Sequence, residues 1–398
     1  MAQETQTGQK LEIDFSFLEN LSNSSNIIEE GANSDSSVKE SSLKYLRLNT
    51  KNIKNLLIID PSFILKRYNY TKEGENPFYR SGLSIDIDSY IIDENNVKVK
   101  TVKTLGTKPA YRALQALLSQ LMHKQYDTVI LAYDCPPYKR LELSEGYKQD
   151  RVPPIDNNPE ETFYNKYLMN DVIFNILNLY KIQVYGCEFD DTASWLLENL
   201  NYESADVLSN DSDLFCHFSN PNIQDKIALS YPEKGQIFRI TKDVFIQKEE
   251  NPNVIIPNFW KFYHILSGGH NNLPKFRPGM AKKGALTILN DMVLRGMCID
   301  SDSIIAYLKT TTRGISEDEI ERLTVCDEMQ DFPLKTLNYK IYKMVEDYVN
   351  REKVLNILGL NVKHTYQEAI KLISLMYNCT EFQATKHLDE DTFYNINK

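Results

Sequence analysis

Four short apolar runs divide the middle of the chain, and each run ends at an acidic residue. They cover residues 55–60, 127–134, 182–188 and 205–211. Continuous apolar runs of this length are typical of strands that are buried on both faces of a parallel sheet. Apolar residues recur at helical spacing in the segments between them, at 110–125, 163–180 and 190–200. Strands that alternate with helices predict an α/β fold with a parallel sheet flanked by helices.

The segments outside this alternation have patterns of their own. Residues 1–50 are rich in Ser, Asn and Glu, which predicts a disordered polar leader. Residues 85–102 alternate apolar and polar positions around an Asn-Asn pair, which predicts a β-hairpin inserted in the main fold. From about residue 255 onward the pattern is helical, with one Gly- and Lys-rich turn at 268–285.

The composition is that of a folded, globular protein. Hydrophobic residues make up 42% of the 398 positions and charged residues 25%, which are ordinary values for a core-forming chain. No apolar run approaches the length of a membrane-spanning helix. The N-terminus has neither a basic region nor an apolar run, so we expect no secretory signal. Six scattered cysteines without a CxxC pair argue against zinc and disulfides. We expect a reduced, cytoplasmic protein.

Acidic residues gather at the C-terminal ends of the four predicted strands. They are Asp60, Asp134, Glu188, Asp190, Asp191, Asp211 and Asp213. A single acid there is more often a turn or cap residue, and Asp190 and Asp191 could simply cap the helix that follows. Several carboxylates that lie close together repel one another, so a fold concentrates them where hard cations bind. Oxygen ligands suit Mg²⁺ or Mn²⁺, and two such ions can clamp a phosphodiester. The pattern therefore predicts metal-assisted phosphoryl transfer.

Five motifs over residues 55–290 carry a family resemblance. They are LLIIDPS, VILAYDCPPYKRLELSEGYKQDR, GCEFDDTASWLL, LSNDSDLF and LSGGHNNLPKFRPGMAKKGALTIL. In this order and spacing the chain resembles the 5′-nucleases of the flap endonuclease group, especially the bacteriophage and bacterial 5′→3′ exonucleases. The resemblance implies a PIN-like α/β fold with a helical arch and a C-terminal helix–turn–helix DNA-binding element.

The chain divides into four expected parts. The resemblance implies two of them, an α/β nuclease core at 51–255 with an arch at about 136–165 and a DNA-binding region resembling a helix-hairpin-helix at 256–300. The leader at 1–50 and a helical region at 301–398 lie outside the resemblance.

By resemblance, the acids divide between two metal ions. The first ion would be held by Asp60, Asp134, Glu188, Asp191 and Asp211, and the second would lie near Asp190 and Asp213. The family's further aspartates for the second ion are replaced here by Gly269 and Asn271, which carry no charge. His270 could coordinate a softer ion or be an ordinary polar loop residue. The departure leaves three outcomes: a weaker enzyme, a one-metal variant, or a catalytically silent DNA-binding relative.

The residues after the second acidic strand would contact the substrate. By resemblance, Lys148 and Arg151 hold the scissile phosphate, Arg140 contacts DNA, and Tyr147 stacks on a terminal base. Acids interleave with these basic residues, so a solvated loop of mixed charge is the plainer interpretation of the residues alone.

The segment KFRPGMAKKGA is the second basic element. By resemblance, Lys275, Arg277, Gly279, Lys282 and Lys283 grip the backbone of duplex DNA. The family often binds K⁺ here, but Ala281 replaces the second hairpin glycine, which counts against a K⁺ site. An ordinary loop at the start of a helix is the alternative.

We therefore expect a cytoplasmic (host cytoplasm if phage-encoded) 5′-nuclease that depends on Mg²⁺ or Mn²⁺. Its substrates would be 5′ ends, flaps and branched duplex DNA, or RNA primers, in replication, repair or primer removal. The alternatives are an inactive DNA-binding relative and an RNA-cleaving nuclease of the same fold. The net charge of −10 does not exclude a nucleic-acid partner, because the leader holds eight acids against four bases and seven further acids form the predicted metal site.

Overall fold

The computed structural model describes most of the chain beyond residue 51. The described residues are 52–69, 84–92, 98–106, 108–135, 137–145, 147–148, 163–184, 186–233, 236–268, 276–277, 279–331, 341–342, 351–352, 355–356, 359–361, 365–377 and 379–396. The predicted leader lies outside these residues.

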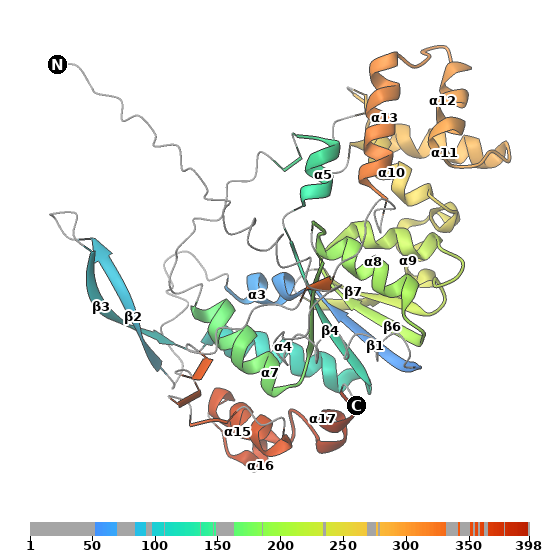
Figure 1. Ribbon diagram of the computed structural model, residues 1–398. Helices are drawn as coiled ribbons and strands as arrows, with labels where there is room; N and C mark the ends of the chain where they lie inside the picture. Colours follow the sequence, from blue (N-terminus) through green and yellow to red (C-terminus); the bar gives the residue numbers. More distant parts are fainter. Residues whose placement is uncertain are drawn as a thin grey trace, which may run out of the picture. The chain divides into compact units, whose positions relative to one another are not determined.

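A seven-stranded sheet forms the centre of the fold (Figure 1). Its strand order is β8-β7-β6-β1-β4-β5-β9. The strands are β1 (Ile53–Ile59), β4 (Thr128–Tyr133), β5 (Tyr180–Val184), β6 (Tyr202–Leu208), β7 (Ile227–Glu233), β8 (Gln236–Ile240) and β9 (Ile341–Tyr342). The inner pairs are parallel, and only β8 and β9 at the two edges pair antiparallel. The predicted α/β class with a mainly parallel sheet is confirmed.

The four predicted strands are neighbours in this sheet. They are β5, β4, β1 and β6, in that spatial order. The last four residues of β1 are fully buried, as are residues 129–132 of β4. Burial on both faces explains why these strands are continuous apolar runs rather than alternating ones. Because all four run parallel, their C-terminal ends and the acids that follow meet at one edge of the sheet.

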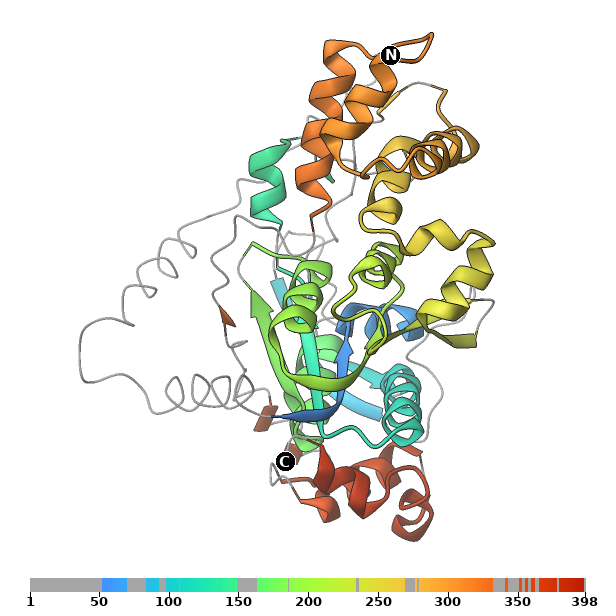
Figure 2. The ribbon, with the colours of Figure 1, turned by 90° about the vertical axis from the view of Figure 1, so that its right-hand side faces the viewer.

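One face of the sheet carries a large apolar cluster. Leu57, Ile59, Val129 and Leu131 point into it. It is covered by α3 (Pro61–Asn69), α4 (Lys108–His123), the π-helix η2 (Phe163–Ile173), α7 (Phe174–Ile176), α15 (Tyr366–Tyr377), α16 (Glu381–Ala384) and α17 (Glu390–Asn395). Figure 2 shows the last three helices, in red, beside α4. The segment predicted as a helix over 163–180 is helical only to residue 176, because β5 begins at Tyr180.

The remaining helices follow the acidic ends of β5 and β6. Helix α8 (Phe189–Asn199) begins after β5, and the 3-10 helix η3 (Ser212–Ser219) begins after β6. An aromatic group of Phe215, Phe218, Phe245 and Trp260 joins η3 to α9 (Lys242–Glu249) and α10 (Phe259–Ser267), with ring centroids 4.9–6.2 Å apart. The other helices that the structure describes are α5 (Tyr138–Leu143), η4 (Pro252–Ile255), α11 (Lys282–Leu294), α12 (Ser301–Lys309) and α13 (Glu317–Met329).

A separate two-stranded sheet confirms the predicted hairpin. Its strands are β2 (Ser84–Ile92) and β3 (Lys98–Gly106), which pair antiparallel from Ser84 with Gly106 to Ile92 with Lys98. Within the described part of the chain, no helix is both long enough and apolar enough to cross a membrane.

Candidate functional site

Three aspartates from the starts of two helices form the centre of the site. Asp190 lies in the first turn of α8, Asp211 is the N-cap of η3, and Asp213 lies in the first turn of η3. Each offers a carboxylate oxygen, and these oxygens lie within 4.8 Å of one another. Asp190 and Asp213 are buried, with 8% and 7% of their surface exposed. We call Asp190, Asp211 and Asp213 the acid cluster.

Local turn chemistry places the two aspartates of η3. The carboxylate of Asp211 accepts a hydrogen bond from the backbone N–H of Asp213 at 2.9 Å, which is an N-cap. The N–H of Asp211 in turn donates to the hydroxyl of Ser209 at 3.2 Å. An Asp-x-Asp sequence at a helix start thus brings both carboxylates to the same end of the helix.

The cluster concentrates negative charge in a buried place. Burial raises the pKa of Asp190 well above its usual range; Arg140 opposes this shift, and Asp191, Asp211 and Glu188 add to it. A carboxyl group whose pKa is raised by burial and by like charges is stabilised by any cation that enters. All donors of the acid cluster are carboxylate oxygens, which is the donor set of a hard divalent cation such as Mg²⁺ or Mn²⁺. The residues present therefore fit such an ion.

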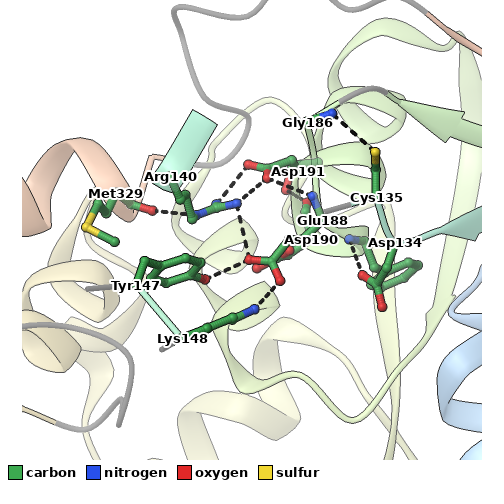
Figure 3. Close-up of polar contacts among 12 residues, drawn as sticks. Asp134, Cys135, Arg140, Tyr147, Lys148, Gly186, Glu188, Asp190, Asp191 and Met329 are labelled. Atoms are coloured by element: carbon green, nitrogen blue, oxygen red, sulfur yellow. Dashed lines mark hydrogen bonds and ion pairs between the residues drawn. The ribbon is translucent and has the colours of Figure 1, made fainter. Parts of the chain in front are cut away.

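Asp191 has a different partner from its neighbour in sequence. Its carboxylate forms a bidentate ion pair with the guanidinium of Arg140, in which Nη2 donates to Oδ1 at 2.9 Å and Nη1 donates to Oδ2 (Figure 3). Oδ2 also accepts the N–H of Glu188, which closes a capping box at the start of α8. Asp191 is thus paired with a protein cation, and its expected role as a metal ligand, directly or through water, stays a prediction.

Arg140 is part of the interior rather than of a DNA-binding surface. Only 1% of its surface is exposed, and its Nε donates to the carbonyl of Met329 at the end of α13. Burial disfavours the charged guanidinium, but the carboxylates of Asp190 and Asp191 outweigh it and hold the pKa of Arg140 above its ordinary value. The expected DNA contact of Arg140 is corrected, because its donors are used inside the protein.

Glu188 is bound by the segment that was expected to hold the substrate. The hydroxyl of Tyr147 donates to Oε2 of Glu188 at 2.7 Å, and the ammonium of Lys148 donates to Oε1 (Figure 3). Lys148 adopts a positive φ of 57°, which is uncommon for a residue other than glycine. Tyr147 and Lys148 therefore lie beside the acids, as expected, and Lys148 forms an ion pair with Glu188. Only 8% of the Tyr147 surface is exposed, so its expected stacking on a terminal base is corrected.

The two remaining strand-end acids connect the elements around the cluster. Asp60 directly follows β1; its Oδ1 accepts the N–H of Phe63 at the start of α3, and its Oδ2 accepts the Ser209 hydroxyl at 3.4 Å. Asp134 follows β4 and is exposed. It accepts the N–H of Phe189 at 2.9 Å and the hydroxyl of Ser62 at 3.1 Å. Both acids lie at the same edge of the sheet as the acid cluster.

The second basic element is only partly described. Lys282 and Lys283 are exposed at the N-terminus of α11, whose first turn contains no acid, and Gly279 just before it has a φ of 77°. Arg277 is buried instead, with both arms on Glu319 at 2.5 and 2.7 Å and a third hydrogen bond to the carbonyl of Gly314. The expected DNA contact of Arg277 is therefore corrected.

Several of the residues singled out in the sequence lie outside the described residues. They are Arg151, Lys275, Gly269, His270 and Asn271.

Sequence reasoning missed the small polar residues that hold the acids in place. Ser209 bridges Asp60 and Asp211, and Ser194 and His217 form a hydrogen bond between α8 and η3. The spacing of Ser209 and Asp211 is a turn signature that could have been recognised. The partner of Ser194 lies 23 residues away, and no local pattern predicts such a pair.

Comparisons with known proteins give a limited result. No family model matches the chain, and no curated protein is similar enough to match. Among solved structures, a Holliday junction-resolving enzyme, GEN1, in complex with product DNA and Mg²⁺, matches with 12% identity and a TM-score of 0.43, over 87% of this chain and 73% of that chain. The catalytic core of Rad2 in complex with a DNA substrate matches with 10% identity and a TM-score of 0.35, over 86% and 94% of the two chains. Both proteins act on DNA, as do those that the motifs resemble, but these values are too low to assign a function.

Proposed function

We propose that the protein is a nuclease that hydrolyses phosphodiester bonds in DNA and requires a divalent cation. The observation that carries the proposal is the acid cluster, in which three carboxylates approach within 4.8 Å at the C-terminal edge of a parallel sheet. Ligands of open α/β sheets bind at this edge. Buried carboxylates at this spacing destabilise one another unless a cation lies between them.

Asp190, Asp211 and Asp213 would hold the cation. A divalent ion bound there supplies a Lewis acid that favours ionisation of a water molecule and stabilises charge on the phosphate. Asp60 and Asp134 fix the backbone around the cluster through hydrogen bonds to Phe63 and Phe189. Arg140 keeps Asp191 paired, so the negative charge that remains for the cation comes mainly from the acid cluster.

Lys148 is proposed to bind the substrate next to this cluster. The Lys148 ammonium carries a positive charge at the site, and its contact with Glu188 can be exchanged for a phosphate oxygen. Tyr147 is not part of this proposal, because only 8% of its surface is exposed and its hydroxyl is bound to Glu188. Arg151 is proposed to act with Lys148 on the same phosphate. These assignments favour substrates with a 5′ end or flap.

Lys282 and Lys283 are proposed to hold the duplex part of the substrate. They extend from the N-terminus of a 13-residue helix without an acid in its first turn. The helix dipole, the free backbone N–H groups and the two ammonium groups all favour a phosphate there. Contacts of this kind bind DNA without regard to sequence.

The test is cleavage of a labelled 5′-flap duplex with Mg²⁺, with Mn²⁺ and with a chelator. Wild type should cleave only with a metal, and Asp211→Asn should lose at least about 100-fold in rate because a charged ligand is removed. The asparagine still accepts the N–H of Asp213, so the turn itself is preserved. Asp243→Asn, in the first turn of α9 and exposed, is the matched control and should cleave normally. Equal rates for wild type and Asp211→Asn would refute the proposed site.

A DNA-binding protein with weak or no activity is the second candidate. The observation that favours it is the pairing of two expected metal ligands, Asp191 and Glu188, with Arg140 and Lys148. Flap duplex binding without cleavage under any metal condition would support this candidate. An RNA flap of matched sequence in the same assay separates a DNA-cleaving from an RNA-cleaving nuclease.

A further inference from the structure

A buried hydrogen bond joins the two helices that carry the acid cluster. Oγ of Ser194 on α8 lies 2.7 Å from Nε2 of His217 on η3. Ser194 has no exposed surface and His217 has 3% exposed, so neither can contact a substrate from solvent. The pair is set back from the carboxylates and has no charge of its own to offer a cation.

Both members of the pair stand at the same distance in sequence from an acid of the cluster. Ser194 follows Asp190 by four residues, and His217 follows Asp213 by four residues. The pair therefore connects α8 and η3 about one helical turn behind the carboxylates. Within α8 the hydroxyl of Ser194 also donates to the carbonyl of Asp190 at 2.5 Å, which links the bridge to the backbone of the acid itself.

The direction of the hydrogen bonds follows from a count of protons. A serine hydroxyl has one proton, and Ser194 donates it to the Asp190 carbonyl. Nε2 of His217 must then carry a proton and donate it to Oγ. Burial lowers the pKa of His217, so at neutral pH the ring is the neutral Nε2–H tautomer. A histidine kept neutral in this way connects the helices without adding a positive charge that would oppose a cation.

We propose that Ser194 and His217 are positioning residues that set the distance between Asp190 and the two aspartates of η3. This inference rests on the proposed metal-dependent function. The carboxylates of the cluster repel one another, so the helices that carry them need an attractive contact to stay close. The hydrogen bond between Ser194 and His217 supplies this contact. Trp260 also fixes η3, by donating to the Ser212 carbonyl at 3.1 Å.

Loss of the hydrogen bond between Ser194 and His217 should weaken binding of the cation. Metal sites require ligand distances within about 0.2 Å of their preferred values. Residues that orient ligands from behind typically change metal affinity by about 10–100-fold when they are replaced. Ser194→Ala and His217→Leu should therefore bind Mn²⁺ at least about tenfold more weakly than wild type. His217→Gln keeps an N–H donor and should bind Mn²⁺ more tightly than His217→Leu.

The experiment is a Mn²⁺ titration of the whole protein, with free Mn²⁺ followed by electron paramagnetic resonance. Thermal unfolding of each variant is measured alongside. Tyr202→Phe is the matched control, because the Tyr202 hydroxyl donates to the carbonyl of Leu197 on the same helix α8 at 2.8 Å. This variant also loses a buried hydrogen bond of α8, so its stability should fall while its Mn²⁺ affinity stays at the wild-type value.

The outcomes separate this inference from the proposed function. If wild type binds Mn²⁺ and the Ser194 and His217 variants bind it equally well, the positioning role is refuted and the proposed function stands. If Tyr202→Phe weakens binding as much as Ser194→Ala does, the effect is one of general stability and the inference is again refuted. If wild type binds no Mn²⁺, both proposals fail. Should Ser194→Ala not fold, the comparison of His217→Gln with His217→Leu decides.

Discussion

Arg140 and Asp191 form a buried bidentate ion pair inside the acidic site, with at most 1% of either side chain exposed. The pair places a protein cation among the strand-end acids and withdraws one carboxylate from the set that could bind a metal. It also joins α5 to the start of α8, and the Nε of Arg140 extends the connection to the end of α13.

Removal of Arg140 should strongly destabilise the protein. Arg140→Met leaves Asp191 as a buried charge without its main partner, which typically costs about 3–5 kcal/mol of unfolding free energy. Urea unfolding at neutral pH measures this loss, and Arg295→Met, which breaks an exposed pair with Asp291, serves as control and should change little. The double variant Arg140→Met/Asp191→Asn should be more stable than Arg140→Met alone. A small effect of Arg140→Met would contradict the role of the pair.

The buried Asp206 in β6 should make Tyr126 important for stability. Asp206 has no exposed surface; it accepts the Tyr126 hydroxyl at 2.6 Å and the Nη2 of Arg239 at 2.9 Å. Tyr126→Phe removes a hydrogen bond to a charged acceptor, which should lower the unfolding free energy by about 1.5–3 kcal/mol. Tyr307→Phe is the control, since the Tyr307 hydroxyl also donates to an aspartate, Asp291, at 2.6 Å. Asp291 is only half-buried, so water can replace that bond and the loss should be smaller; an equal loss in the two variants would contradict the prediction.

Acid should destabilise the protein through His217. Burial lowers the pKa of His217 from 6.5 to about 4. Above pH 6.5 neither the folded nor the unfolded chain protonates this residue. As the pH falls from 6.5 to 4, only the unfolded chain takes up the proton, so the unfolding free energy should decrease by up to about 3 kcal/mol.

The measurement for His217 is urea unfolding at pH 7 and pH 4.5 in wild type and in His217→Gln. The glutamine cannot titrate, so the variant should lose less stability between these two pH values than wild type does. Equal losses in the two proteins would show that His217 does not contribute to the acid sensitivity.

The basic residues at the start of α11 should bind DNA, and Arg277 should not. Replacement of Lys282 and Lys283 by glutamine removes two exposed charges, which should weaken duplex binding for every sequence and reduce the slope of log affinity against log salt by about 2. Lys309→Gln is a control at an exposed lysine in the last turn of α12. An unchanged salt slope in the double variant would exclude this helix from the interface.

Arg277→Met should act on stability instead of on DNA binding. Its guanidinium pairs with Glu319 and lowers the pKa of that carboxyl group to about 2. Loss of DNA affinity by a folded Arg277→Met variant, with the same change in salt slope as the lysine variants, would place Arg277 in the DNA interface.

The central sheet could be predicted because its strands are local patterns. Residues 56–59 of β1 and 129–132 of β4 are apolar without interruption, and burial on both faces produces that pattern directly. Strands β7 and β9 were not predictable in this way. Strand β9 has only two residues and depends on pairing with β5, which lies far away in the sequence, and β7 is interrupted by Pro232.

The acids of the site could be found from the sequence, but their partners could not. Asp190 and Asp191 are adjacent, yet successive residues of a helix point about 100° apart. One carboxylate therefore faces the acid cluster and the other faces Arg140, which lies 51 positions away. Which basic residues are buried depends likewise on distant contacts, as for Arg277 and Glu319, which lie 42 positions apart.

Anomalous diffraction from a crystal soaked in Mn²⁺ tests the account most directly. Wild type should show a peak bounded by the carboxylates of Asp190, Asp211 and Asp213, at about 2.0–2.4 Å from their oxygens. Asp211→Asn, soaked in the same way, should lose most of this peak, while Asp243→Asn should keep it. A wild-type crystal that binds Mn²⁺ elsewhere on the chain and shows no density at the acid cluster would contradict the proposed metal site.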